Sequence, residues 1–172
     1  MHRWTLTTIA RLFISGWVPF KTNGRLRSSD SGRSIREVAE DVQHEFGGLR
    51  IRHKDGALTF LSTLFNECHP DHPDAVAVAT ILATAAKDLH RELTPIGILD
   101  GVDEDWVVID QHLQVYFLTN RGGEWDLDLF AVSFAMAIEF FCGGASGSEL
   151  QDSKKGLSSC ECHHSYRYAS SL

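Results

Sequence analysis

The sequence has no long hydrophobic run and few cysteines. No apolar stretch reaches the ~18–20 residues that a transmembrane helix needs. Residues 1–20 are fairly apolar, but Arg11 and three threonines interrupt them and no small-residue cleavage site follows, so we expect no signal peptide. The four cysteines form no pattern typical of a disulfide framework, and two of them lie in a polar C-terminal stretch. We therefore expect a protein of a reducing, cytoplasmic compartment.

The short motifs of common enzyme classes and an excess of basic charge are also missing. There is no Gly-x-Ser-x-Gly nucleophile elbow, no Gly-x-x-x-x-Gly-Lys-[Ser/Thr] phosphate loop and no Gly-x-Gly-x-x-Gly dinucleotide motif. Lys and Arg number 16 against 23 Asp and Glu, a net charge of −7 that argues against a general nucleic-acid binder. We expect a non-enzymatic protein that needs no cofactor and binds neither nucleic acid nor membranes.

The composition is that of a globular domain. The chain has 172 residues, of which 43% are hydrophobic and 23% charged, and these values exclude a wholly disordered chain, a collagen and a coiled coil. From residue 145 onward, however, eight of 28 residues are serine and aliphatic side chains are scarce. We therefore expect one domain over 1–144, followed by a mobile polar tail over 145–172 that adds nothing to the core.

Hydrophobic periodicity predicts an α+β fold. Helical spacing indicates helices over 2–15, 35–46, 75–91 and 134–142, and Ser34 with Glu37 forms a capping box for the second of them. Alternating and β-branched patterns predict strands at 49–54, 57–61, 96–99, 106–110 and 113–119. We expect a hairpin turn at Asp55-Gly56 and a polar loop at 120–126. Their short connections favour antiparallel neighbours, so we expect an antiparallel sheet with helices packed on it.

Two groups of residues have the side-chain types of metal ligands. The first is His69, Asp71 and His72, and the second is the Cys160, Cys162, His163 and His164 group in the polar tail. A metal site needs three or four ligands that converge from rigid elements. The first group shares one proline-bracketed loop and the second lies in the tail, so we expect no metal site. A small metal-dependent hydrolase that uses the first group is the enzymatic alternative.

Several motifs follow one another along the chain. In Glu45-Phe46-Gly47-Gly48-Leu49, two glycines turn a helix directly into a strand, and Trp106–Asp110, Leu113–Tyr116 and Ser133–Gly143 come after it. The order of these motifs resembles the SUKH superfamily of immunity proteins, specifically its third immunity subgroup. The resemblance covers about residues 9–144, and the Glu45–Leu49 motif is its most specific element. The residues that we assign to the family's fold motifs are Gly16, Trp17, Phe46, Gly47, Gly48, Leu49, Pro95 and Gly97.

The resemblance implies a binding function. Members of this superfamily are non-enzymatic proteins of bacterial polymorphic toxin systems, in which they bind a cognate toxin domain, often a nuclease or a deaminase, and protect the producing cell. The motif residues themselves are packing and turn devices, so they do not locate the face that binds the toxin. A general protein-interaction module unrelated to toxins is the second alternative, because one scaffold serves many functions.

Charge suggests where a toxin would bind. Residues 99–128 contain eight Asp and Glu residues and one basic residue, Arg121. The net charge of this segment is therefore −7, which equals the net charge of the whole chain. Nuclease toxins grip phosphates through basic clefts, so an inhibitor of such a cleft presents carboxylates, and an exposed tryptophan between acids suits a binding hot spot. The toxin-binding residues that we expect are Asp103, Glu104, Asp105, Glu124, Trp125 and Asp126. The sequence equally allows that Trp125 packs on the core while the acids only face water.

Overall fold

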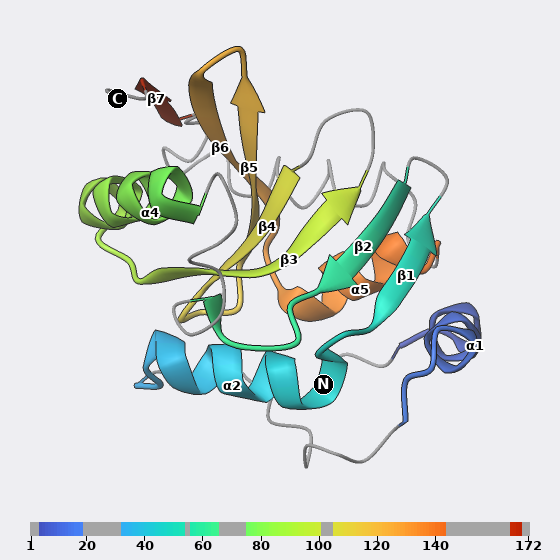
Figure 1. Cartoon of the computed structure of the whole chain (residues 1–172). Helices are drawn as coiled ribbons and strands as arrows, with labels where there is room; N and C mark the ends of the chain where they lie inside the picture. Colours follow the sequence, from blue (N-terminus) through green and yellow to red (C-terminus); the bar gives the residue numbers. More distant parts are fainter. Residues whose placement is uncertain are drawn as a thin grey trace.

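The computed structural model describes residues 4–18, 32–53, 56–65, 75–100, 105–143 and 166–169, and these residues form an α+β fold. The described strands make one seven-stranded antiparallel sheet in which each strand pairs with its neighbours in sequence (Figure 1). The strands are β1 (Arg50–His53), β2 (Gly56–Phe60), β3 (Leu93–Asp100), β4 (Asp105–Asp110), β5 (Val115–Arg121), β6 (Glu124–Ala131) and β7 (Tyr166–Ala169). The helices are α1 (Leu6–Ile14), α2 (Ile35–Phe46), α4 (Ala75–Leu89) and α5 (Phe134–Phe141).

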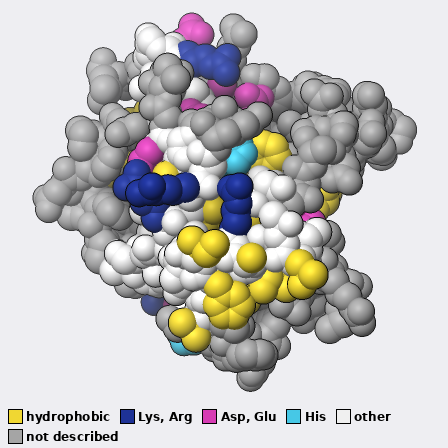
Figure 2. Space-filling model, turned by 90° about the vertical axis from the view of Figure 1, so that its right-hand side faces the viewer, with side chains coloured by type: hydrophobic (Ala, Val, Ile, Leu, Met, Phe, Trp, Pro, Cys, Tyr) yellow, Lys and Arg dark blue, Asp and Glu magenta, His cyan; other side chains and the backbone are white. Residues whose placement is uncertain are grey.

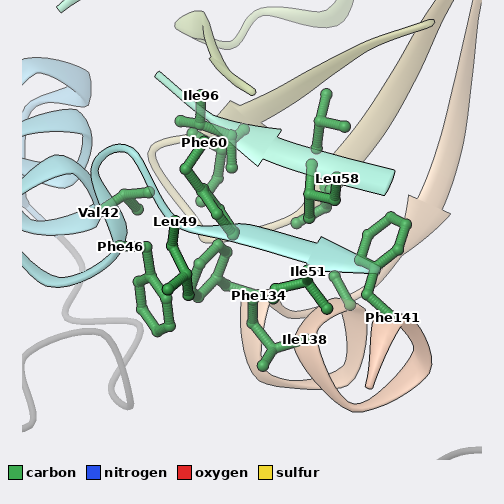
Figure 3. Close-up of a cluster of buried hydrophobic side chains, with 14 of the residues drawn as sticks. Val42, Phe46, Leu49, Ile51, Leu58, Phe60, Ile96, Phe134, Ile138 and Phe141 are labelled. Atoms are coloured by element: carbon green, nitrogen blue, oxygen red, sulfur yellow. The ribbon is translucent and has the colours of Figure 1, made fainter. Parts of the chain in front are cut away.

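Helices cover both faces of the sheet, so the core consists of two clusters. The larger cluster packs α1, α2 and α5 against one face, and Figure 3 shows its centre, where Phe46 and Phe134 meet the strand residues Ile51 and Phe60. The smaller cluster packs α4 against the other face, around Trp106. The side chains of α4 that enter it are those that helical spacing predicts: Val78, Ile81, Leu82 and Ala85.

Side-chain caps set where three of the helices begin. Thr5 Oγ1 accepts a hydrogen bond from the backbone N–H of Thr8 at 3.2 Å, and Ser133 Oγ accepts one from the N–H of Met136 at 3.3 Å. Ser34 and Glu37 form the expected capping box, in which the Ser34 N–H donates to Glu37 Oε2 at 2.9 Å. These caps satisfy backbone donors that have no partner inside the helix. The predicted starts of α2 and α5 are therefore correct, whereas the helix predicted over 2–15 starts too early, because Thr5 caps α1.

Gly47 and Gly48 turn α2 directly into β1. Gly48 has φ +73°, the left-handed region that favours glycine, which confirms the expectation of a positive φ at this pair. Gly47 has negative φ, but a Cβ there would lie 2.4 Å from the carbonyl oxygen of Gln43. The N–H of Gly48 donates to the carbonyl of Phe60 at 3.2 Å, so the turn is tied to β2.

The strand expectations are wrong at several places. Residues 124–131 form β6 rather than part of a polar loop, because Gly122 and Gly123, both at positive φ, close a tight hairpin turn between β5 and β6. β3 begins before Pro95, and the chain makes a β-bulge between Pro95 and Gly97. His53 pairs with Gly56, so Gly56 belongs to β2 rather than to the turn centre.

The C-terminal stretch also departs from expectation in one segment. Residues 166–169, which fall in the predicted polar tail, form β7 and pair with β6 in antiparallel register, Asp126 opposite Arg167. The core clusters on the two faces of the sheet contain no residue after Cys142 among the residues that the structure describes. The rest of the predicted tail lies outside the described residues.

Replacing Gly48 with valine should destabilise the fold. A β-branched side chain is strained at positive φ, so we expect Gly48→Val to lower the free energy of unfolding by more than ~1 kcal/mol. Asparagine tolerates this conformation better, so Gly48→Asn should cost clearly less. Urea denaturation of both variants and the parent chain measures the difference. Equal stability of the valine variant and the parent would show that the turn carries no conformational constraint.

Candidate partner-binding surface

The residues that carry the family resemblance meet at one junction between helices and sheet. Trp17 is buried and its ring lies parallel to that of Phe46, with centroids 6.4 Å apart and an interplanar angle of 9°. Phe46 also contacts Phe134 edge to face at 5.4 Å. At Gly97 the strands approach so closely that a Cβ would lie 2.8 Å from the carbonyl oxygen of Thr59. These residues build the fold and present no binding group to solvent.

The predicted acidic segments lie at the same end of the sheet. β3 ends and β4 begins at this end, and the turn between β5 and β6 also lies there (Figure 1). Asp105 comes one residue before Trp106, which pairs with Leu118, and Asp126 comes one residue before Leu127, which pairs with the same Leu118. Asp105 and Asp126 therefore sit at one level on the same face, two strand spacings or about 10 Å apart.

The acidic side chains at this end differ in exposure. Glu124 is exposed and Asp105 is half-buried, whereas Asp126 is buried and its Oδ2 lies 3.9 Å from Nε of Arg121. Asp100, at the end of β3, accepts a hydrogen bond from Nη2 of Arg50 at 3.0 Å, and both side chains are exposed. We call Asp100, Asp105, Glu124 and Asp126 the acidic end. Asp103 and Glu104 lie outside the described residues.

Trp125 does not have the exposure that a binding hot spot requires. Its side chain is only 2% exposed and packs in the smaller core cluster with α4. Strand alternation explains this position, because Trp125 and Leu127 point to the α4 face while Glu124 and Asp126 point to the other. Of the two interpretations, the structure therefore supports packing of Trp125 on the core over its exposure as a hot spot. The acidic end offers carboxylates, and Trp125 does not serve as an aromatic anchor there.

A polar cluster that the sequence does not predict lies at the other end of the sheet. It contains Asp110, which the charge pattern groups with the acidic residues of 99–128. Asp110 is fully buried. Its Oδ1 accepts hydrogen bonds from the N–H groups of His112 and Gln114, both at 2.8 Å, and closes the turn between β4 and β5. Its Oδ2 accepts from Nη1 of Arg91 and from the Tyr116 hydroxyl, the latter at 3.2 Å. The charge of Asp110 is thus paired internally.

The electrostatics of this cluster fit a structural role. Burial raises the pKa of Tyr116 above its ordinary value, and the charge of Asp110 adds to the shift. Burial lowers the pKa of Arg91, but its hydrogen bond to Asp110 and the neighbouring charges outweigh this effect and raise it. Both oxygens of Asp110 have donors and the side chain has no solvent contact. The group therefore holds the turn and does not meet a substrate.

The described residues offer little for catalysis or metal binding. Among them, no three His, Cys, Asp or Glu side chains gather in a way that could hold a metal ion. Both groups that the sequence suggested as metal ligands lie outside the described residues. A cavity of about 150 Å³ beside α2 is lined by Ile35, Arg36, Ala39, Leu64, Phe65, Leu93 and Thr94. Arg36 is its single titratable group, and Nε of Arg36 lies 2.8 Å from Glu40.

Comparisons of the chain with protein-family models, curated proteins and solved structures found no match. In the part of the chain that the structure describes, no helix combines the length and apolar character needed to cross a bilayer. The acidic end is the candidate site, because its carboxylates are groups that can accept hydrogen bonds from Lys and Arg side chains.

Removing the Asp110 carboxylate should destabilise the protein strongly. Asp110→Ala leaves Arg91 without its buried partner and two turn N–H groups without acceptors, so we expect a loss of at least about 2 kcal/mol. Glu124→Ala removes an exposed carboxylate and should change stability by less than about 0.5 kcal/mol. Urea denaturation compares the two variants. Similar costs for both would contradict the structural role of Asp110.

The raised pKa of Tyr116 predicts a loss of stability in alkali. Because the folded state keeps the phenol proton at pH values where the unfolded chain releases it, the free energy of unfolding should fall as the pH rises above about 10. Tyr116→Phe should be less stable at neutral pH by about 1 kcal/mol, with a flatter decline above pH 10. Denaturation at several pH values measures both slopes, and parallel slopes would exclude this linkage.

Proposed function

We propose that the protein is a non-enzymatic, cytoplasmic immunity protein with a SUKH-like fold, which binds and neutralises a cognate toxin domain of a bacterial polymorphic toxin system. The observation that carries the proposal is the junction of the motif residues. Trp17 and Phe46 stack, and Gly48 turns the chain, at one junction between α1, α2 and the sheet. The α+β fold, with a meandering antiparallel sheet and flanking helices, agrees with the resemblance.

The acidic end is the surface that we propose for the toxin. Asp105 and Glu124 come from different hairpins but lie at the same end of the sheet, and Asp103 and Glu104 precede Asp105 in the connection from β3. A nuclease active site that grips phosphates is basic, so carboxylates in this arrangement steer the encounter and oppose the charge of the cleft. Inhibition then follows from covering the cleft, and no reaction is needed.

The internal contacts keep these carboxylates in place. Asp126 faces Arg121 across the tight turn, and Trp125 fixes β6 on the α4 cluster from the opposite face. A rigid hairpin loses little conformational entropy when it binds. The absence of an aromatic anchor at this end implies that electrostatic steering contributes more to the association rate than to the lifetime of the complex.

Charge reversal at the acidic end tests the proposal. The experiment uses the toxin domain encoded by the neighbouring gene, first for co-purification with this chain and then for association kinetics at low and high salt. Glu124→Lys combined with Asp105→Lys should slow association on the order of tenfold and weaken its salt dependence. Asp126 is left unchanged because it is buried. Glu40→Lys, an exposed reversal on α2, is the matched control and should bind like the parent.

Each outcome of this experiment has a distinct meaning. Co-purification with slower association of the double variant supports both the function and the surface. Co-purification with unchanged kinetics would place the interface elsewhere on the protein. No binding to the neighbouring gene product, together with no protection of cells that express it, would contradict the immunity function and favour a general protein-interaction module.

A further inference from the structure

Helix α1 presents an apolar face to solvent as well as to the core. Four of the five exposed large hydrophobic side chains among the described residues lie on α1 or just after it, with exposed fractions of 86% for Leu6, 52% for Phe13, 86% for Ile14 and 58% for Val18. Figure 2 shows hydrophobic side chains gathered on this side of the molecule. At 100° per residue, Leu6, Phe13 and Ile14 share one side of the helix, opposite the buried Thr8 and Leu12.

A helix that is apolar on both sides normally has cover on both. The buried side of α1 contributes Leu12 to the larger core cluster, and no described element covers the other side, as its exposed fractions show. The fifth exposed large hydrophobic residue, Val76, stands alone on α4 and needs no explanation. The contiguous α1 surface, by contrast, is of the kind that marks an interaction site.

Basic residues flank this apolar surface. Arg11 and Arg52 are exposed, and Nη1 of Arg11 donates to the carbonyl of Arg52 at 3.4 Å, which brings α1 next to the edge strand β1. Arg50 is also exposed but pairs with Asp100. Figure 2 shows Lys and Arg side chains beside the hydrophobic ones on this face. The occupant of this surface is therefore anionic.

Size and charge argue for a lipid surface over a protein. A helix of nine residues is only about 14 Å long, so it supplies a small part of the ~800 Å² per partner of a standard protein interface. A second copy docked through the same face would bring its arginines against Arg11 and Arg52. Strand addition to β1 is also disfavoured, because Arg11 already occupies an edge carbonyl. A lipid surface needs only a few inserted side chains and nearby basic residues.

In contrast to the expectation from the sequence that the protein binds no membrane, we propose that it binds the surface of an anionic phospholipid bilayer through α1. Leu6, Phe13, Ile14 and Val18 enter the boundary between headgroups and acyl chains, and the flanking arginines contact lipid phosphates. The turn between β5 and β6 lies at a different end of the molecule from α1, so the acidic end remains in water (Figure 1). The proposal is independent of the proposed function, because it uses Arg11 and Arg52 and none of Asp100, Asp105, Glu124 and Asp126.

Vesicle co-sedimentation of the full chain tests this proposal. The probes are vesicles of phosphatidylcholine alone and vesicles with about one third phosphatidylserine, at roughly 0.1 M and 0.5 M salt. The parent chain should bind the anionic vesicles at least about tenfold more than the neutral ones, and less at high salt. Phe13→Ser combined with Ile14→Ser should reduce this binding about tenfold. Val76→Ser, which removes an exposed apolar side chain from α4, is the matched control and should bind like the parent.

A second variant tests the basic flank. Arg11→Gln combined with Arg52→Gln should weaken binding to anionic vesicles several-fold and leave the small binding to neutral vesicles unchanged. Circular dichroism confirms that each variant is folded. The proposal is overturned if the parent does not bind anionic vesicles, or if Val76→Ser loses as much binding as the α1 variant. It is also overturned if sedimentation without lipid shows self-association that the α1 variant abolishes, since the surface would then be a protein interface.

Discussion

The packing of Phe46 at the end of α2 is the contact on which the rest of the fold depends. Its ring meets Trp17 from the segment after α1, Phe60 from β2 and Phe134 from α5, so three helices and the sheet share one side chain. The next two residues are glycines, and only this pair lets the chain leave the helix and enter β1 without a loop. The position of α1 relative to the sheet follows from the same junction.

Two surfaces of opposite character result from this arrangement. The antiparallel order of the strands collects the turns after β3 and β5 at one end, where Asp105 and Glu124 lie. The junction places α1 beside β1, where apolar side chains and arginines are exposed together. The exposed apolar side chains of α1 thus lie apart from Asp105 and Glu124, whereas Arg50 of β1 pairs with Asp100. We propose that the α1 surface meets an anionic bilayer and the acidic end a basic partner.

Local patterns in the sequence predict the helices, the Ser34 cap and the glycine turn, because these depend on residues within one or two turns of chain, but they do not predict the Thr5 cap of α1. Pairings between distant residues are harder to predict. The polar composition of 120–126 indicates a loop, although Trp125 and Leu127 alternate with acidic neighbours as in a strand. The burial of Asp110 depends on Arg91, 19 residues away, and β7 pairs with a strand more than 30 residues earlier in the chain. At the candidate site, Asp105 and Asp126 lie at the same level of the sheet because of the pairing register of β4, β5 and β6. The spacing of residues along the sequence does not specify this register.

Amide hydrogen exchange of the chain, alone and bound to the toxin domain of the neighbouring gene, tests the central claim most directly. It follows every backbone amide and requires no substitution. The account predicts slower exchange on binding in the connection between β3 and β4 and in the turn between β5 and β6, with α2 and α4 unchanged. Protection confined to other elements, with these two segments exchanging as in the free protein, would contradict the claim that the acidic end binds the toxin.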